Sequence, residues 1–260
     1  MRYLPLFTAL FLLSPLCFGA ENDHVAIANQ NAPAVVTINV AKKDGTTFTG
    51  TGFVLTQDGL IATSRHVTQD SLYSNITFNT GAVSGEAIVV AEAGNVDLSL
   101  LKIKALHLPV VYLADSDTVL PGQPITVIGN PRRLQNTISS GLISQVRKKA
   151  DGVIWHQISA PISPSSSGSP VFNAEGKVVS VAFASYSGEG NQNLNFAIPS
   201  NYLRQLAYRA GFSLPVHPED QPATATQQET NPFKAHIQKS WEIVKRLFSR
   251  PQKAQATARS

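Results

Sequence analysis

Short β-rich runs separated by turn residues fill the chain from Val35 to Ile198, and they constrain the fold more than any other feature. Asp58-Gly59 and Glu175-Gly176 each lie between two apolar runs, where a tight turn needs a residue with positive φ. No helical stretch of about 10 to 15 residues separates the runs, so a parallel sheet with crossover helices is not expected. The pattern therefore predicts antiparallel strands in a barrel or a sandwich.

A helix and then a linker are predicted after the last strand. Ser200 and Asn201 can cap a helix over residues 201–210, whose apolar residues share one face and which Gly211 would end. Residues 213–232 are rich in Pro, Gln and Thr, a composition typical of a linker.

A second, basic amphipathic helix is predicted over residues 233–249. Its apolar residues recur at spacings of 4, 4, 3 and 4, and Lys and Arg occupy much of the remainder. This helix either docks on the strands or pairs with itself, or it binds a membrane surface or a partner protein, as basic amphipathic helices do. Residues 250–260 are expected to be disordered.

Residues 1–20 have the layout of a secretory signal peptide. Arg2 precedes a short apolar stretch broken by proline, and the segment ends in Gly19-Ala20, where cleavage is expected. The alternative is an uncleaved anchor. Cys17, the single cysteine, lies in this segment, so the mature chain would have no disulfide and no cysteine-based zinc site. We expect an exported bacterial protein, either periplasmic or secreted.

The distribution of charge argues against nucleic-acid binding by the globular part. Residues 20–216 contain 13 Lys and Arg against 13 Asp and Glu, which cancel, whereas residues 217–260 contain 7 against 4, which leaves +3. A nucleic-acid binder would instead carry a basic patch on its globular domain. His107, His156 and His217 have no spacing typical of metal ligands, so neither a metal nor another cofactor is predicted.

Three polar residues that are far apart in the sequence form a candidate catalytic site. Ser167 lies in a loop (160–173) where proline and glycine favour a bend that would expose a nucleophile. His66 follows an apolar run, and Asp97 begins another, where a carboxylate needs hydrogen bonds that an imidazole could supply. Each alone has a plainer explanation: a serine-rich loop, a surface or core histidine, and a turn-capping Asp. Their order, with gaps of 31 and 70 residues, favours a catalytic triad.

Seven segments within residues 35–201 match motifs of one enzyme family in that family's order. They are GTGFV at 50–54, TSRHV at 63–67, DLSLLKI at 97–103, PGQ with IGNP at 121–123 and 128–131, SGLIS at 140–144, ISPSSSGSP at 162–170, and FAIPS at 196–200. In these motifs the chain resembles the chymotrypsin-fold serine proteases, and specifically their HtrA (DegP-like) branch.

This resemblance implies an all-β fold of two six-stranded Greek-key barrels, about residues 22–113 and 114–200, closed by the helix at 201–210. The protease domain would cover residues 21–212, without a PDZ domain. Ser167 would be the nucleophile, His66 the general base and then the general acid, and Asp97 the orienting carboxylate. The backbone N–H groups of Ser165 and Ser167 would form the oxyanion hole.

The sequence departs from the family pattern at Ser165, where glycine is usual, and more mildly at Ser169. A Cβ narrows the allowed backbone angles, so serine fits Ser165 if the loop adopts negative φ, and the oxyanion hole would then form only after activation. By resemblance, uncharged residues would wall the substrate pocket, which suits a small aliphatic side chain. These residues are Pro161, Ile162, Ser163, Ala182, Phe183, Ala184 and Ser185.

We therefore predict a serine endopeptidase that hydrolyses unfolded or exposed polypeptides through an acyl-enzyme. The alternative is a catalytically silent pseudoprotease whose cleft binds a peptide or a partner protein, and Ser165 is the reason to consider it. The sequence leaves the oligomeric state open.

Overall fold

The computed structural model describes residues 24–130, 136–188 and 191–221. It divides the chain into two compact units, Met1–Val216 and His217–Ser260. The predicted signal segment 1–20, most of the predicted linker, the basic helix 233–249 and the tail 250–260 lie outside the described residues. In the second unit, the described residues form one short 3-10 helix, η4 (Pro218–Asp220). No helix in the described ranges is both long and apolar enough to cross a membrane.

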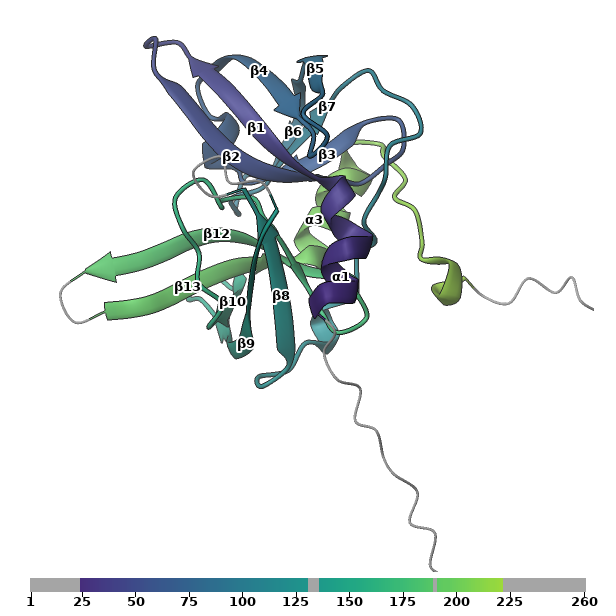
Figure 1. The fold of residues 1–260 in the computed structure, drawn as a ribbon. Helices are drawn as coiled ribbons and strands as arrows, with labels where there is room; N and C mark the ends of the chain where they lie inside the picture. Colours follow the sequence, from purple (N-terminus) through teal and green to yellow (C-terminus); the bar gives the residue numbers. More distant parts are fainter. Residues whose placement is uncertain (1–23, 131–135, 189–190, 222–260) are drawn as a thin grey trace, which may run out of the picture. The chain divides into compact units, whose positions relative to one another are not determined.

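The first half of the larger unit is an antiparallel sheet with the strand order β5-β4-β1-β2-β3-β7-β6 (Figure 1). Its strands are β1 (Val35–Lys42), β2 (Thr47–Val54), β3 (Leu60–Thr63), β4 (Ser71–Thr77), β5 (Val83–Glu86), β6 (Ile88–Glu92) and β7 (Ser99–Lys102). A Cβ on Gly50 of β2 would lie only 2.6 Å from Val67. Glycine at this position therefore lets the segment that carries His66 pack directly against β2.

The second half is a closed antiparallel barrel with the strand order β10-β13-β12-β11-β8-β9. Its strands are β8 (Pro124–Gly129), β9 (Thr137–Lys148), β10 (Ile154–Ile158), β11 (Pro170–Phe172), β12 (Val178–Gly188) and β13 (Asn191–Pro199). The all-β, double-barrel class of fold and the six-stranded second barrel are confirmed.

The six-stranded closed barrel predicted for the first half is wrong in detail, because that sheet has seven strands. Ala87 divides one extended segment into β5, which pairs with β4, and β6, which pairs with β7. The Ala87 N–H still donates to Ser74 of β4, while the next residue, Ile88, is already paired with Lys102 of β7. The chain thus passes from one edge of the sheet to the other at a single residue. The residues before Ala87 form β5 at one edge, and those after it form β6 at the other edge.

One hydrophobic cluster joins the two halves. It contains Phe53 and Leu100 of the first sheet together with Phe172 and Val181 of the second barrel, and all four are fully buried. A smaller cluster around Ile158 and Val171 fills the inside of the second barrel. Because the larger cluster includes side chains from both halves, their relative position is set by close packing.

Two helices, α1 (His24–Asn31) and α3 (Ser200–Arg209), flank the strands (Figure 1). α3 begins and ends within one residue of the predicted helix at 201–210, but the predicted cap is wrong. The Ser116 hydroxyl accepts the Asn201 N–H at 3.0 Å, whereas the Ser200 hydroxyl donates to the Ala114 carbonyl. A hydroxyl distant in sequence therefore takes the place of a local cap.

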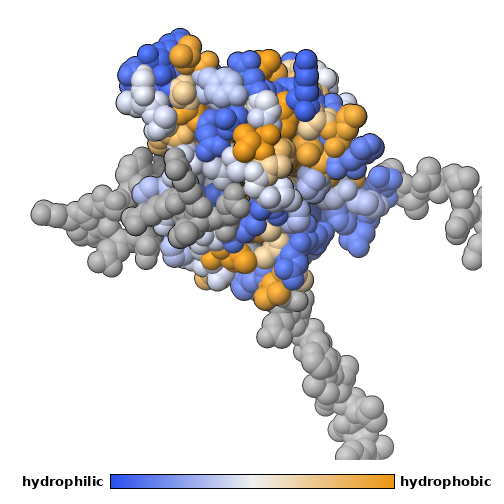
Figure 2. All heavy atoms as spheres, turned by 45° about the horizontal axis from the view of Figure 1, so that its top comes forward, coloured by the Kyte–Doolittle hydropathy of each residue, from blue (hydrophilic) through white to orange (hydrophobic). Residues whose placement is uncertain are grey.

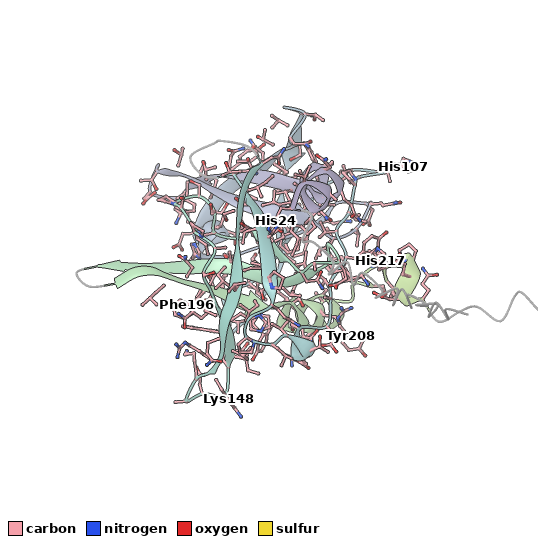
Figure 3. All side chains as sticks on the ribbon, turned by 60° about the horizontal axis from the view of Figure 1, so that its bottom comes forward. His24, His107, Lys148, Phe196, Tyr208 and His217 are labelled. Atoms are coloured by element: carbon pink, nitrogen blue, oxygen red, sulfur yellow. The ribbon has the colours of Figure 1, made fainter. Side chains whose placement is uncertain are left out.

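The α1 helix is fastened to the second barrel at its first residue. Nδ1 of His24 lies 2.7 Å from the hydroxyl of Thr126 in β8. His24 is labelled in Figure 3. Ile27 and Ala28 of α1 are buried in the larger hydrophobic cluster, so the helix is part of the folded domain.

Several large apolar side chains remain exposed on the first sheet. Leu72, Val83 and Ile88 are 69%, 60% and 59% exposed. In Figure 2 apolar patches alternate with polar ones over this part of the surface. The exposed apolar residues are thus interspersed with polar residues on the face shown.

Candidate active site

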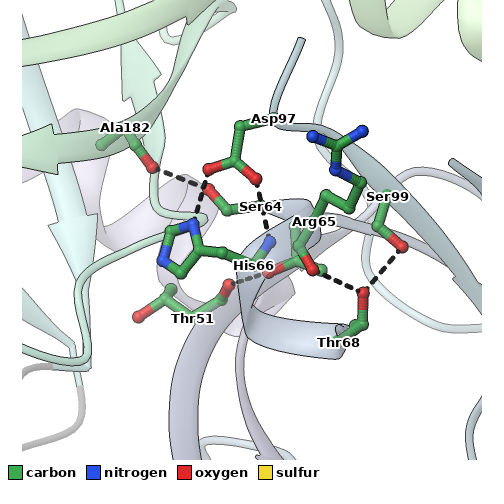
Figure 4. Close-up of polar contacts among 9 residues, drawn as sticks. Thr51, Ser64, Arg65, His66, Thr68, Asp97, Ser99 and Ala182 are labelled. Atoms are coloured by element: carbon green, nitrogen blue, oxygen red, sulfur yellow. Dashed lines mark hydrogen bonds and ion pairs between the residues drawn. The ribbon is translucent and has the colours of Figure 1, made fainter. Parts of the chain in front are cut away.

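His66 lies on α2 (Arg65–Thr68), a single helical turn that follows β3. Two hydrogen bonds connect this turn to the segment around Asp97. Arg65 Nη1 donates to the Ala93 carbonyl at 2.8 Å. The Thr68 hydroxyl donates to the Ser99 hydroxyl at 3.1 Å (Figure 4). Contacts on both sides of Asp97 therefore hold α2 in place.

Asp97 binds His66 through both carboxylate oxygens, as Figure 4 shows. Oδ2 lies 2.5 Å from ring Nδ1, and Oδ1 accepts the His66 backbone N–H at 2.8 Å. The side chains are 37% exposed for His66 and 20% for Asp97. With the Nδ1 proton directed at the carboxylate, the neutral ring has its lone pair on Nε2. The structure thus joins the predicted base to the predicted orienting carboxylate.

Two consecutive β-turns, Ser163–Ser166 and Ser166–Ser169, form the loop around Ser167, which lies in the second turn. The Ser166 N–H donates to the Ser163 carbonyl, and the Ser169 N–H donates to the Ser166 carbonyl, each at 3.0 Å. The third residue of each turn has positive φ: +73° at Ser165 and +88° at Gly168. With Pro164 in second place, the first is a type II turn, whose third residue needs positive φ. The negative φ that was the condition for serine to fit at Ser165 is therefore not what the structure has.

The Ser167 loop is bonded to the first sheet and to β12. The Thr51 N–H donates to the Ser167 carbonyl at 2.9 Å, and the Gly168 N–H donates to the Ala182 carbonyl at 2.7 Å. A Cβ on Gly168 would collide with the Thr51 carbonyl oxygen and would lie 3.1 Å from the Ser64 nitrogen. Ser167 therefore lies next to the segment Ser64–His66, although 101 positions separate Ser167 from His66.

The backbone N–H groups of Ser165 and Ser167 have no acceptor within the part of the chain that the structure describes. Among the same described residues, no hydrogen bond joins the Ser167 hydroxyl to the His66 ring. Catalytic hydrogen bonds in ligand-free sites are often long and tighten when substrate binds. The arrangement therefore leaves two free donors beside a hydroxyl and an oriented imidazole.

The residues predicted to wall the substrate pocket differ in exposure. Pro161 and Ser163 are exposed, Ile162 is half-buried, and Phe183 is half-buried against the Trp155 ring at 5.0 Å. Ala182 is fully buried in the core of the second barrel. Its side chain therefore lines no open surface, and its carbonyl instead accepts the Gly168 N–H and the Ser64 hydroxyl.

Ala184 and Ser185, the remaining predicted wall residues, lie in β12. They pair with Phe196 and Asn195 of β13. This pairing places their backbone beside the last strand of the barrel.

Thr51 and Asn130 are site residues that the sequence analysis missed. The buried Thr51 hydroxyl donates to the Ser165 carbonyl at 2.8 Å and accepts the Asn130 N–H at 3.0 Å. Both residues lie in motifs quoted above, Thr51 in GTGFV and Asn130 in IGNP. These motifs do not show what the Thr51 hydroxyl contacts.

A second histidine–serine pair lies inside the second barrel. His156 Nδ1 is 2.6 Å from the Ser180 hydroxyl, and burial lowers the pKa of His156 to about 4. Both residues are almost inaccessible to solvent, so this pair is structural. No group of three or more His, Cys, Asp or Glu side chains that could hold a metal occurs among the residues described.

Residues 50–181 match the model of the trypsin-like peptidase domain family. The chain is 34% identical over 166 residues to a putative serine protease HhoB of Synechocystis sp.. The aligned region covers 61% of this chain and 39% of that protein. The chain is 36% identical over 156 residues to a probable periplasmic serine endoprotease DegP-like of Chlamydia pneumoniae. The aligned region covers 58% of this chain and 32% of that protein.

Solved structures with the same fold include the following two. One is the HtrA-type protease AlgW with tripeptide, with a TM-score of 0.66 and 26% identity over 73% of this chain and 65% of that chain. The other is the serine endoprotease from Yersinia pestis, with a TM-score of 0.64 and 27% identity over 72% of this chain and 66% of that chain.

With more than half of its length matched, the chain belongs to the trypsin-like peptidase domain family. Within that family its relatives and structural neighbours include HtrA-type proteases, which confirms the resemblance seen in the motifs. The chain spans about a third to two fifths of the length of the curated relatives named above.

Proposed function

We propose that this protein is a serine endopeptidase with His66, Asp97 and Ser167 as its catalytic triad. The observation that carries the proposal is the double hydrogen bond from His66 to Asp97, which orients a basic Nε2 on the segment beside the Ser167 loop. An imidazole held in this tautomer can take a proton from a serine hydroxyl.

The proposed reaction has two halves that use the same groups. Ser167 Oγ attacks the peptide carbonyl carbon while His66 Nε2 takes its proton, and the carbonyl oxygen becomes an oxyanion. The N–H groups of Ser165 and Ser167 stabilise that charge. The imidazolium then gives its proton to the leaving amine, and the C–N bond breaks to leave an acyl-enzyme. A water molecule, deprotonated by His66, releases the acid and regenerates Ser167.

We propose unfolded or exposed polypeptide as the substrate. The candidate pocket residues Pro161, Ile162 and Ser163 carry no charge, which disfavours Lys or Arg at the cleaved position and suits a small aliphatic side chain. A related protease, AlgW, has been solved with a tripeptide, and this supports binding of an extended peptide.

We further propose that the protein is exported to the periplasm or secreted, after removal of residues 1–20. The word periplasmic in the names of several relatives supports this location. The basic segment 233–249 is proposed to contact a membrane surface or a protein partner.

The test is active-site labelling of the purified chain with a fluorophosphonate, together with hydrolysis of an unfolded protein substrate. The wild type should be labelled and should hydrolyse the substrate, and Ser167→Ala and His66→Ala should abolish both. Ser166→Ala is the matched control, because that neighbouring serine is buried and outside the proposed triad. Full hydrolysis by Ser167→Ala would refute the proposal.

A pseudoprotease is the second candidate function. It is favoured by the absence, among the described residues, of a hydrogen bond between the Ser167 hydroxyl and the His66 ring. In that case the cleft would bind a peptide without cleaving it. No labelling under any condition, with peptide binding unchanged in Ser167→Ala, would establish this function.

A further inference from the structure

We propose that Arg65 is a positioning residue, whose side chain fixes the loop of Asp97 against α2 and so sets the contact between His66 and Asp97. This inference rests on the proposed peptidase function. Arg65 is half-buried, and its Nη1 donates to the Ala93 carbonyl at 2.8 Å. Figure 4 shows Arg65 together with His66 and Asp97.

The loop that carries Asp97 joins β6 to β7 and is closed at its base by a hydrogen bond. The Ala93 N–H donates to the Leu98 carbonyl at 3.0 Å. The Leu98 N–H in turn donates to the Val96 carbonyl at 3.0 Å, so Asp97 is the central residue of a three-residue γ-turn. Asp97 therefore lies next to the base of the loop, where Leu98 is bonded to Ala93.

The two parts of this loop are supported differently. The neighbours of Asp97 on both sides are buried in the larger hydrophobic cluster. Gly94 and Asn95, by contrast, are exposed, and a Cβ added to Gly94 would meet no other atom within 4 Å. The Ala93 carbonyl belongs to the peptide that leads into this exposed part. The Arg65 bond therefore restrains the part of the loop that packing leaves free.

Arg65 and His66 are adjacent on α2, and they contact this loop at two places. Arg65 binds Ala93, and His66 binds Asp97. Because Ala93 is also bonded across the base of the loop, these contacts form a closed ring of hydrogen bonds. A change in the position of α2 relative to the loop must therefore stretch or break at least one bond of the ring.

The contact between His66 and Asp97 is sensitive to such a change. Its Nδ1–Oδ2 distance of 2.5 Å is short for a hydrogen bond from nitrogen, and this bond selects the tautomer with its lone pair on Nε2. Loss of the Arg65 bond opens the ring, so fewer His66 side chains present a basic Nε2. A positioned general base contributes about 10²- to 10⁴-fold to a rate, and a partial loss of orientation should remove a small part of this factor.

The first test is Arg65→Met, which keeps an unbranched apolar side chain and removes the guanidinium. We expect kcat on a peptide substrate to fall about fivefold with little change in KM, because His66 acts as a base in the transition state and not in substrate binding. An unchanged kcat in Arg65→Met would overturn the inference. If Arg65→Met does not fold, Arg65→Gln takes its place, because the amide of Gln ends well short of the guanidinium of Arg.

Arg204→Met is the matched control. Arg204 also donates from Nη2 to a backbone carbonyl, that of Leu113 at 3.1 Å, and it lies on α3, outside the proposed triad. We expect Arg204→Met to keep the wild-type kcat, whatever stability either variant loses in urea denaturation. An equal loss of kcat in both variants would show a general effect and would contradict the role given to Arg65.

The tautomer of His66 tests the same inference without any activity. Nitrogen NMR of the imidazole ring reports which nitrogen carries the proton, and comparison with His66→Ala assigns the signals. In Arg65→Met a larger share of the His66 rings should carry the proton on Nε2 than in the wild type. Identical His66 signals in the two proteins would overturn the inference.

The failure of this inference can be told apart from the failure of the proposed function. A wild-type protein that neither hydrolyses substrate nor reacts with the fluorophosphonate would refute the proposed function. The tautomer of His66 in Arg65→Met would still decide whether Arg65 holds His66 and Asp97 in contact.

Discussion

Asp97 accepts two hydrogen bonds from His66, one from ring Nδ1 at 2.5 Å and one from the backbone N–H at 2.8 Å. Because both donors belong to one residue, the carboxylate restrains the ring relative to its own backbone. Nε2 lies on the other side of the ring from Nδ1. The hydrogen bond between Nδ1 and Asp97 therefore directs Nε2 away from Asp97. The geometry therefore gives the carboxylate a role in orienting the His66 ring.

Asp97→Asn should lower kcat by about 10³- to 10⁴-fold, with the fold intact. The Asn side-chain amide would donate to Nδ1 and move the ring proton to Nε2, which could then no longer accept the Ser167 proton. Steady-state kinetics and a circular dichroism spectrum would check both parts. Asp44→Asn, at an exposed turn, is the control and should leave kcat unchanged. An Asp97→Asn enzyme with more than about a tenth of wild-type kcat would contradict the assignment.

Gly168→Ala should lower both stability and activity, because a Cβ at this position collides with the Thr51 carbonyl. Gly122→Ala separates this collision from backbone strain, because Gly122 has a similar φ of +92° but a Cβ added there would meet no other atom within 4 Å. We expect Gly122→Ala to cost about 1 kcal/mol and Gly168→Ala clearly more. Urea denaturation of both variants would measure the difference, and equal losses would show that the close approach at Gly168 is unimportant.

The stability of the domain should fall as the pH drops from 7 to 4, in part because of His156. Burial lowers the pKa of His156 from 6.5 to about 4, and the nearby charge of Asp117 opposes this only partly. Below pH 6.5 the unfolded chain takes up a proton that the folded chain does not bind until about pH 4, so the free energy of unfolding decreases. The loss from this residue should reach about 3 kcal/mol.

Urea denaturation at several pH values would check this effect of His156. His156→Gln removes the titrating group while keeping a polar side chain near Ser180, and its unfolding free energy should depend less on pH between 7 and 4. His107→Asn, which replaces an exposed histidine, is the control and should leave the pH dependence unchanged. An identical slope in His156→Gln and the wild type would show that His156 does not cause the acid sensitivity.

Local features of the sequence were enough to predict antiparallel strands, whereas the His66–Asp97 pair was predicted from the order of the motifs and from their resemblance to a family. Apolar runs and turn residues predict antiparallel strands because they act over a few neighbouring residues. The division of the first sheet at Ala87 could not be predicted this way, because it depends on pairing with two strands that are distant in sequence.

Ser165 shows the limit of local reasoning most clearly. The intrinsic preference of serine predicts negative φ, but the structure has +73°. The Thr51 hydroxyl, 114 positions earlier in the chain, donates to the Ser165 carbonyl, and no local pattern reveals that contact. The same holds for the Ser116 hydroxyl at the start of α3.

The sequence by itself determined the alternation of strands and turns and the identity of the three candidate catalytic residues, because these depend on residue type and order. Only the tertiary structure decided how the Ser167 loop is oriented and which groups hold it. Its backbone conformation depends on hydrogen bonds from the other half of the domain, and these exist only after the two halves have packed together.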